Sequence, residues 1–202
     1  MRRPDTICAF AAPGGMLEAF LVSAGIVALA EIGDKTQLLA LVLAARYRRP
    51  APVILGILAA TLANHALAAW LGAGVAAALG PEMLRWILGF SFLAMAAWTL
   101  VPDKPEKEKT QTARLGAFAA TLIAFFLLEM GDKTQIATVA LAARYASIAA
   151  VVAGTTLGMM LADVPAVYFG ERILRRAPAK TMHRIAAASF ALLGALALID
   201  AV

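Results

Sequence analysis

The sequence contains very little cysteine, histidine and charge. Among 202 residues there are one cysteine, Cys8, and two histidines, and charged residues make up 15% of the chain. A single cysteine cannot form a disulfide within the chain, and it cannot build a thiolate metal site. Hydrophobic residues make up 62%, and the mean hydropathy is +0.80. Soluble domains are less apolar and more charged, so the composition indicates an integral membrane protein.

The sequence also lacks the motifs of several enzyme and binding classes. It has no G-x-x-x-x-G-K-[ST] loop, so nothing supports a nucleotide-driven pump, and no nucleophile stands at helical spacing from a base. The net charge of +5 comes from bases in short loops between apolar runs. Membrane topology explains such bases better than nucleic-acid binding does. We therefore expect no cofactor, no nucleotide and no nucleic-acid partner.

Six apolar runs are long enough to be membrane helices. We predict spans at about 16–45, 51–71, 83–101, 115–144, 148–169 and 181–201. The first run is longer than a bilayer needs, so a tilt or a break near Gly33 is expected. It also continues past any small-residue cleavage site, which argues against a signal peptide.

A linker rich in proline and charge, residues 102–113, divides the chain. It separates two predicted halves of three helices each, 16–101 and 114–202, after a tail at 1–15. Because three is an odd number, the second half must be inverted relative to the first. The predicted fold is thus an all-α integral membrane protein with six transmembrane helices arranged as two inverted three-helix repeats, an architecture found in transporters.

Basic residues are distributed unevenly between alternate loops. The side that holds the N-terminus carries Arg2, Arg3, Arg85 and Arg144, and the other side carries Arg46, Arg48, Arg49, Lys104, Lys107, Lys109, Arg114, Arg172, Arg175, Arg176, Lys180 and Arg184. Lysine and arginine accumulate in cytoplasmic loops. We therefore predict a multi-pass protein of the cell inner membrane with both termini outside the cytoplasm.

One short motif occurs twice, inside the first apolar run of each half. Residues 31–37 read E-I-G-D-K-T-Q and residues 129–135 read E-M-G-D-K-T-Q, an offset of 98. Each charge near the bilayer centre costs roughly 2.5–3.5 kcal/mol on insertion scales, which favours a functional role. The alternative is a pair of structural salt bridges, but each copy has two acids for one lysine and so leaves an acid over.

The side chains of each motif are predicted to act together. On a helix, Glu31, Asp34 and Lys35 would share a face that Gln37 borders. The hydroxyl of Thr36 would bond a backbone carbonyl or, as we prefer, join the site if the helix opens at the motif glycine. The same argument gives the second set, which is Glu129, Asp132, Lys133, Thr134 and Gln135.

Antiparallel placement of the two copies would bring four carboxylates and two lysines together. Their formal sum is −2, the charge that one divalent cation neutralises. Buried carboxyl groups also bind protons more readily, so protons and a cation could compete for the same oxygens without ATP. Carboxylate, amide and hydroxyl oxygens suit Ca²⁺, Mn²⁺ and Mg²⁺ better than Zn²⁺ or Cu⁺.

Several polar residues outside the acid set have more than one interpretation. His65 could be a softer ligand favouring Mn²⁺ or a packing residue, and Asn64 is expected to bond between helices. Asp163 could be a coupling proton site or a partner of a motif lysine. Lys35 and Lys133 could repel competing cations, pair with Asp163 or accept protons.

The doubled E-x-G-D-K-T motif resembles the Gdt family of membrane cation/proton exchangers, also called uncharacterised protein family 16. The resemblance covers about residues 16–201 and implies export of Mn²⁺ or Ca²⁺ from the cytosol in exchange for protons. It also implies that the ion is held at the membrane midplane by four acids supported by two threonines, namely Glu31, Asp34, Glu129 and Asp132 with Thr36 and Thr134.

The short tail and linker look like those of a compact bacterial member, for which Mn²⁺ is the expected cargo. The alternatives are an exporter of small organic cations or amino acids, which would use the same acids as counter-charges, and a membrane scaffold that transports nothing. The expected partners are the cation, protons and the lipid bilayer. The oligomeric state is left open.

Overall fold

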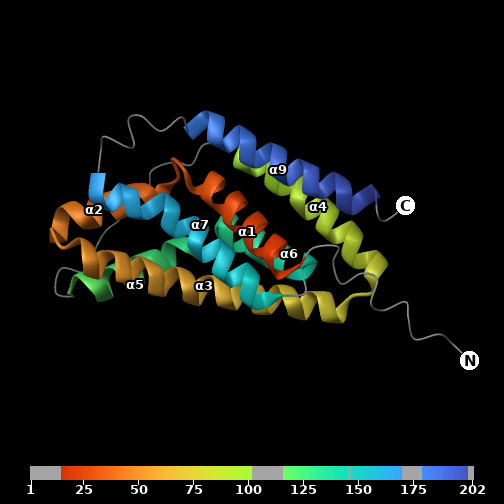
Figure 1. Ribbon diagram of the computed structural model, residues 1–202, viewed down its shortest axis with the longest axis horizontal. Coiled ribbons are helices and arrows are strands. Elements are labelled where there is room, and N and C mark those ends of the chain that lie inside the picture. The colour runs from red at the N-terminus through yellow and green to blue at the C-terminus, as the bar shows by residue number, and fades with distance from the viewer. Residues whose placement is uncertain (1–14, 102–115, 146, 170–178, 200–202) are drawn as a thin grey trace, which may run out of the picture.

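The computed structural model describes residues 15–101, 116–145, 147–169 and 179–199, and within these ranges it is entirely helical (Figure 1). The helices in chain order are α1 (Met16–Glu31), α2 (Lys35–Tyr47), α3 (Pro50–Ala78), α4 (Pro81–Thr99), α5 (Ala117–Glu129), α6 (Lys133–Arg144), α7 (Ile148–Phe169) and α9 (Ala179–Ile199). This confirms the all-α prediction. The tail with Cys8 and the linker 102–113 lie outside the described residues.

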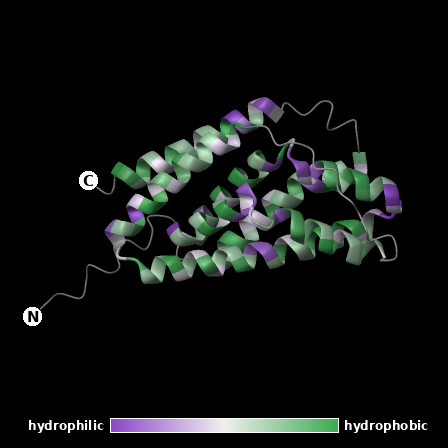
Figure 2. Ribbon diagram, turned by 180° about the vertical axis from the view of Figure 1, so that it is seen from behind, coloured by the Kyte–Doolittle hydropathy of each residue, from purple (hydrophilic) through white to green (hydrophobic). Residues whose placement is uncertain are grey.

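Length and composition identify three helices that could cross a membrane, and a fourth if a bent pair is counted. The three are α3, α7 and the Lys180–Ile199 part of α9, and the bent pair is α1 with α2. Figure 2 shows apolar residues along most of the helices, with hydrophilic patches at helix ends and inside the bundle. Large apolar side chains such as Trp70 are exposed on the outside. The six predicted crossings stay a prediction.

Both motif copies lie at a break between two helices. Between α1 and α2 the axis bends by 73°, and Gly33 has a φ of 87°. Between α5 and α6, Gly131 has a φ of 78°. Such left-handed backbone is favourable for glycine and strained for other residues. The predicted break near Gly33 is confirmed, and it changes the geometric argument, because the motif residues do not share the face of one continuous helix.

The described helices of the two halves pack on one another in a reciprocal way. Helix α1 packs on α7 and α5 packs on α3, while α2 also contacts α7 and α6 also contacts α3. A Cβ added at Gly56 would lie 2.7 Å from Cβ of Thr121. A Cβ added at Gly154 would lie 3.0 Å from Cβ of Ser23. Both residues of the second contact are related to those of the first by the offset of 98, so the contacts of one half recur in the other.

Two apolar clusters hold the helices together. One cluster contains Phe92 of α4, Phe190 of α9 and Leu141 of α6, and Figure 1 shows α4 and α9 side by side along one edge of the bundle. The second contains Ile57 of α3 and Phe125 of α5. The charged motif residues belong to neither cluster. The two helix breaks therefore lie outside both apolar clusters.

Candidate cation site

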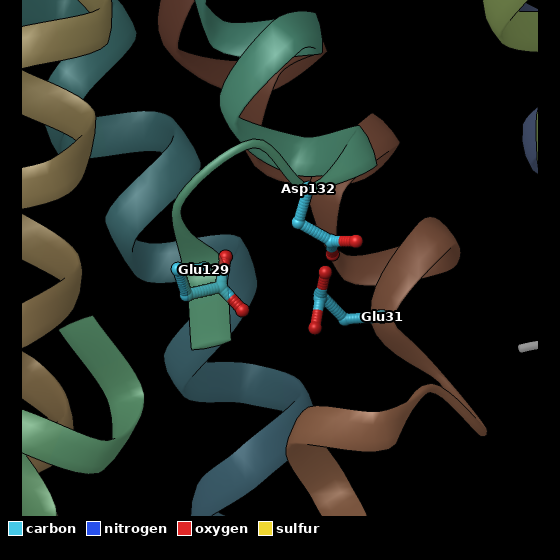
Figure 3. A group of neighbouring side chains, drawn as sticks. All are labelled: Glu31, Glu129 and Asp132. Carbon is cyan, nitrogen blue, oxygen red and sulfur yellow. The ribbon is translucent and has the colours of Figure 1, made fainter. Parts of the chain in front are cut away.

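Three carboxylates from the two motifs converge at the helix breaks. Glu31 ends α1, Glu129 ends α5, and Asp132 precedes α6. One carboxylate oxygen of each lies within 4.8 Å of those of the other two, and the residues are 0%, 0% and 5% exposed. Figure 3 shows the three side chains turned toward one another. The structure therefore brings acids of both motif copies to one point, a spacing at which one cation can touch all three.

Each of these acids has one buried oxygen without a hydrogen-bond partner among the described residues. Oε1 of Glu31, Oε1 of Glu129 and Oδ2 of Asp132 are buried and have no hydrogen-bond partner within the described ranges. Buried charged oxygens without a partner are strongly destabilising unless a cation or a proton compensates them. Three hard oxygen ligands of this kind fit Mn²⁺, Ca²⁺ or Mg²⁺. The arrangement is thus suited to an exchangeable hard cation.

A threonine orients each glutamate across its helix break. Oγ1 of Thr36 donates to Oε2 of Glu31 at 2.5 Å, and Oγ1 of Thr134 donates to Oε2 of Glu129 at 2.9 Å. These bonds occupy Oε2 of each glutamate and leave Oε1 without a hydrogen-bond partner in the described part of the chain. Each threonine thus contacts a glutamate of the three-acid group across the opened helix, and its part in binding a cation stays a prediction.

The motif glutamines bond to backbone at the breaks. Oε1 of Gln37 accepts from N of Gly33 at 2.9 Å, and its Nε2 donates to the carbonyl of Ala162 at 2.9 Å. Oε1 of Gln135 accepts from N of Gly131 at 2.7 Å. These carbonyl oxygens stabilise the two turns. A direct role of Gln37 and Gln135 as cation ligands stays a prediction.

Each motif lysine reaches the aspartate of the other motif. Nζ of Lys35 lies 3.2 Å from Oδ1 of Asp132, and Nζ of Lys133 lies 3.8 Å from Oδ2 of Asp34. Sequence reasoning missed this crossed pairing. Within a single sequence only the charge balance of the two copies hinted at it. The crossed pairs join the halves directly at the site.

The polar residues of α3 and α7 lie in different surroundings. Nδ2 of Asn64 donates to the carbonyl of Phe126 at 3.0 Å, which confirms the predicted bond between helices. Asp163 is fully buried, and neither of its oxygens has a hydrogen-bond partner in the part of the chain that the structure describes. The same holds for both ring nitrogens of His65. Neither residue belongs to the three-acid group.

The offset that relates the motifs also relates His65 to Asp163. The contacts of Gly56 and Gly154 keep the offset of 98 in α3 and α7, and the same offset separates His65 from Asp163. The packing thus makes His65 the counterpart of Asp163, so the two halves differ here by a histidine and a carboxylate.

Comparisons with known proteins agree on one family. Residues 19–107 and 117–202 match the family described as "Divalent cation/proton antiporter GDT1". A protein of Vibrio cholerae serotype O1 named "Putative manganese exporter" is 52% identical over 179 residues, which are 88% of this chain and 89% of that protein. A GDT1-like protein of Synechocystis is 31% identical over 190 residues, 84% of this chain and 91% of that protein. No solved structure matches the chain.

Proposed function

The chain belongs to the GDT1 family of divalent cation/proton antiporters, and from this premise we propose that it exports Mn²⁺ from the cytosol in exchange for protons. It is therefore a membrane transporter and not an enzyme. The observation that carries the proposal is the convergence of Glu31, Glu129 and Asp132, with unpartnered buried oxygens, from both motif copies. The name of the Vibrio cholerae relative supports manganese as the cargo, and Ca²⁺ suits the same oxygens.

The proposed architecture is six membrane spans in two inverted halves, 16–101 and 114–202, with both termini outside the cytoplasm. The reciprocal packing of α1 on α7 and α5 on α3 supports it, as do the crossed lysine–aspartate pairs. Two-fold pseudosymmetry of this kind places a substrate site where the repeats meet, near the bilayer midplane. In this arrangement the halves rock against each other and expose the site to one face at a time.

The exchange follows from competition for the same carboxylate oxygens. When the cation leaves, the negative charge of Glu31, Glu129 and Asp132 remains in a site that excludes water, and binding of protons relieves it. When the cation returns, it displaces those protons. Thr36 and Thr134 keep each glutamate oriented in both steps, because a hydroxyl donor fits a carboxylate oxygen and also the carbonyl oxygen of a protonated carboxyl group.

Purified protein in liposomes that contain a pH-sensitive dye tests the proposal. Mn²⁺, Ca²⁺, Mg²⁺ or the amino acid lysine is added outside, and the internal pH is followed. We expect Mn²⁺ to drive proton movement, and Glu31→Gln or Glu129→Gln to abolish it. Glu82→Gln, at an exposed acid at the start of α4, is the matched control and should transport normally. Proton movement driven only by lysine, or unchanged in both glutamate variants, would contradict the proposal.

A further inference from the structure

The two motif copies share several of their local contacts. Each threonine bonds its own glutamate, and each glutamine bonds the N–H of its own glycine. Each lysine faces the aspartate of the other copy. Asp34 and Asp132 occupy equivalent positions but bond differently. Since the motifs differ only by Ile32 against Met130, their own sequence gives no reason for this difference.

Asp34 is used to begin a helix, whereas Asp132 is not. Oδ1 of Asp34 accepts a hydrogen bond from the backbone N of Lys35 at 2.8 Å, so Asp34 caps α2. Asp132 stands at the same position before α6, but its side chain makes no capping bond. It turns instead toward Glu31 and Glu129 and completes the three-acid group. The start of α6 therefore has no side-chain cap, and only Asp132 of the two motif aspartates belongs to the three-acid group.

The lysines paired with the two aspartates also differ, in their exposure and in their distance from the carboxylate. The side chain of Lys35 is 19% exposed and that of Lys133 is 3% exposed. The Lys35–Asp132 pair is also the closer one, at 3.2 Å against 3.8 Å for Lys133–Asp34. The α2 end of the site is thus the less enclosed end, and the acid that has joined the glutamates is the one paired with the more exposed lysine.

We propose that Asp132 and Asp34 alternate as the third carboxylate, each in one access state. In the state seen here, Glu31 and Glu129 hold the ion with Asp132, while Asp34 caps α2. In the opposite state the same two glutamates hold it with Asp34, while Asp132 turns away and caps α6 through the backbone N of Lys133. This inference rests on the proposed exchange function, and it assigns a different face of the membrane to each aspartate.

The energetics of the exchange support such an alternation. An aspartate side chain that caps a helix stabilises its first turn, so the bond lost at one helix is replaced by an equivalent bond at the other. The crossed lysines keep a partner in both states, since each motif offers the same groups. The two states then differ little in local bonding, which is what a carrier requires if it is to move between them.

Affinity measured separately at each face tests the proposal. Inside-out and right-side-out membrane vesicles are prepared with Asp34→Asn, Asp132→Asn and the exposed-acid control Glu82→Gln, and the Mn²⁺ concentration for half-maximal proton flux is measured. We expect Asp132→Asn to raise this Mn²⁺ concentration at least about tenfold at one face, as loss of groups around a metal ion does. At the other face the concentration should be nearly unchanged. Asp34→Asn should give the opposite pattern.

Two further outcomes are informative. If both variants lower the Mn²⁺ affinity at the same face, or equally at both faces, the proposed alternation is wrong, although the protein still exchanges Mn²⁺ for protons. If the unmodified protein shows no flux driven by Mn²⁺ or Ca²⁺ in either preparation, it is the proposed function that fails. Should either asparagine variant not fold, Asp34→Glu and Asp132→Glu retain the charge with a longer side chain and must show the same opposite preference of face.

Discussion

Oγ1 of Thr36 lies 2.5 Å from Oε2 of Glu31, so a side chain in the first turn of α2 spans the helix break to the last residue of α1. The same bond joins Thr134 to Glu129 in the other half. Both hydroxyls are buried, at 0% and 1% residue exposure. Each glutamate is thereby held in one orientation, which determines where its remaining oxygen can meet a cation.

Removal of this hydroxyl should weaken cation binding without unfolding the protein. We expect Thr36→Val to raise the Mn²⁺ concentration for half-maximal flux about 10–100-fold, the usual effect of losing a group that orients a metal ligand. Thr36→Ser keeps the hydroxyl and should stay close to the unmodified protein. Thr99→Val is the control, because Thr99 is equally buried but donates to the carbonyl of Met95 in its own helix. Equal behaviour of Thr36→Val and Thr99→Val would show that the hydroxyl does not orient the ligand.

Much of this site could be predicted from two stretches of sequence. The doubled motif identifies the acids and threonines, and the excess length of residues 16–45 indicates a break. A stronger signal for that break was also present, since Asp34 followed three residues later by Gln37 resembles a helix-start pattern, and a glycine precedes it. In the structure Gln37 does reach back to the N of Gly33. The local sequence around Gly33 therefore contains the information needed to predict where the helix breaks.

Other features depend on contacts that a single sequence does not contain. The pairing of Lys35 with Asp132 depends on how the two halves are placed relative to each other in space. The hydrophobic pattern of the sequence contains no information about that placement. The different use of Asp34 and Asp132 is not encoded in their motifs, because the two copies are nearly identical. The number of spans is ambiguous for a related reason, since the break divides an apolar run into α5 and α6, each shorter than a bilayer-spanning helix.

The left-handed backbone at Gly131 should make this position intolerant of a side chain. An added Cβ would meet no atom within 4 Å, so the effect of Gly131→Ala is purely conformational and should cost about 1–2 kcal/mol of stability. Gly25 in α1 also has open space around it, and Gly25→Ala should stabilise by roughly 0.5–1 kcal/mol. Thermal unfolding in detergent compares the two variants. A Gly131→Ala protein as stable as Gly25→Ala would contradict the assigned backbone conformation.

The close helix approaches at Gly56 and Gly154 should respond alike to substitution. An added Cβ at Gly56 would come within 2.9 Å of the carbonyl oxygen of Phe118, and backbone also blocks the space at Gly154. We expect each alanine variant to lose about 1–3 kcal/mol, the range for overpacking. Gly74→Ala in α3, where no atom lies within 4 Å, is the control. A loss at only one of the two glycines would argue against equivalent packing of the halves.

The crossed ion pairs should show their largest energetic effect where they are most buried. Lys133→Met leaves the carboxylate of Asp34, a residue 1% exposed, without its lysine partner, and loss of one partner of a buried pair costs about 3–5 kcal/mol. Removing both charges in the double variant Lys133→Met/Asp34→Asn leaves no uncompensated carboxylate there, so the double variant should be more stable than Lys133→Met alone.

The same substitution at the Lys35–Asp132 pair shows whether the stability loss depends on burial of the pair. Lys35→Met should destabilise less than Lys133→Met, because the side chain of Lys35 is 19% exposed, so water already solvates part of its charge and the ion pair contributes less. Chemical or thermal unfolding of all variants in the same detergent measures the differences. If the double variant at Lys133 and Asp34 lost as much stability as the sum of its single changes, the two side chains would not interact, and the lysine would act through another contact.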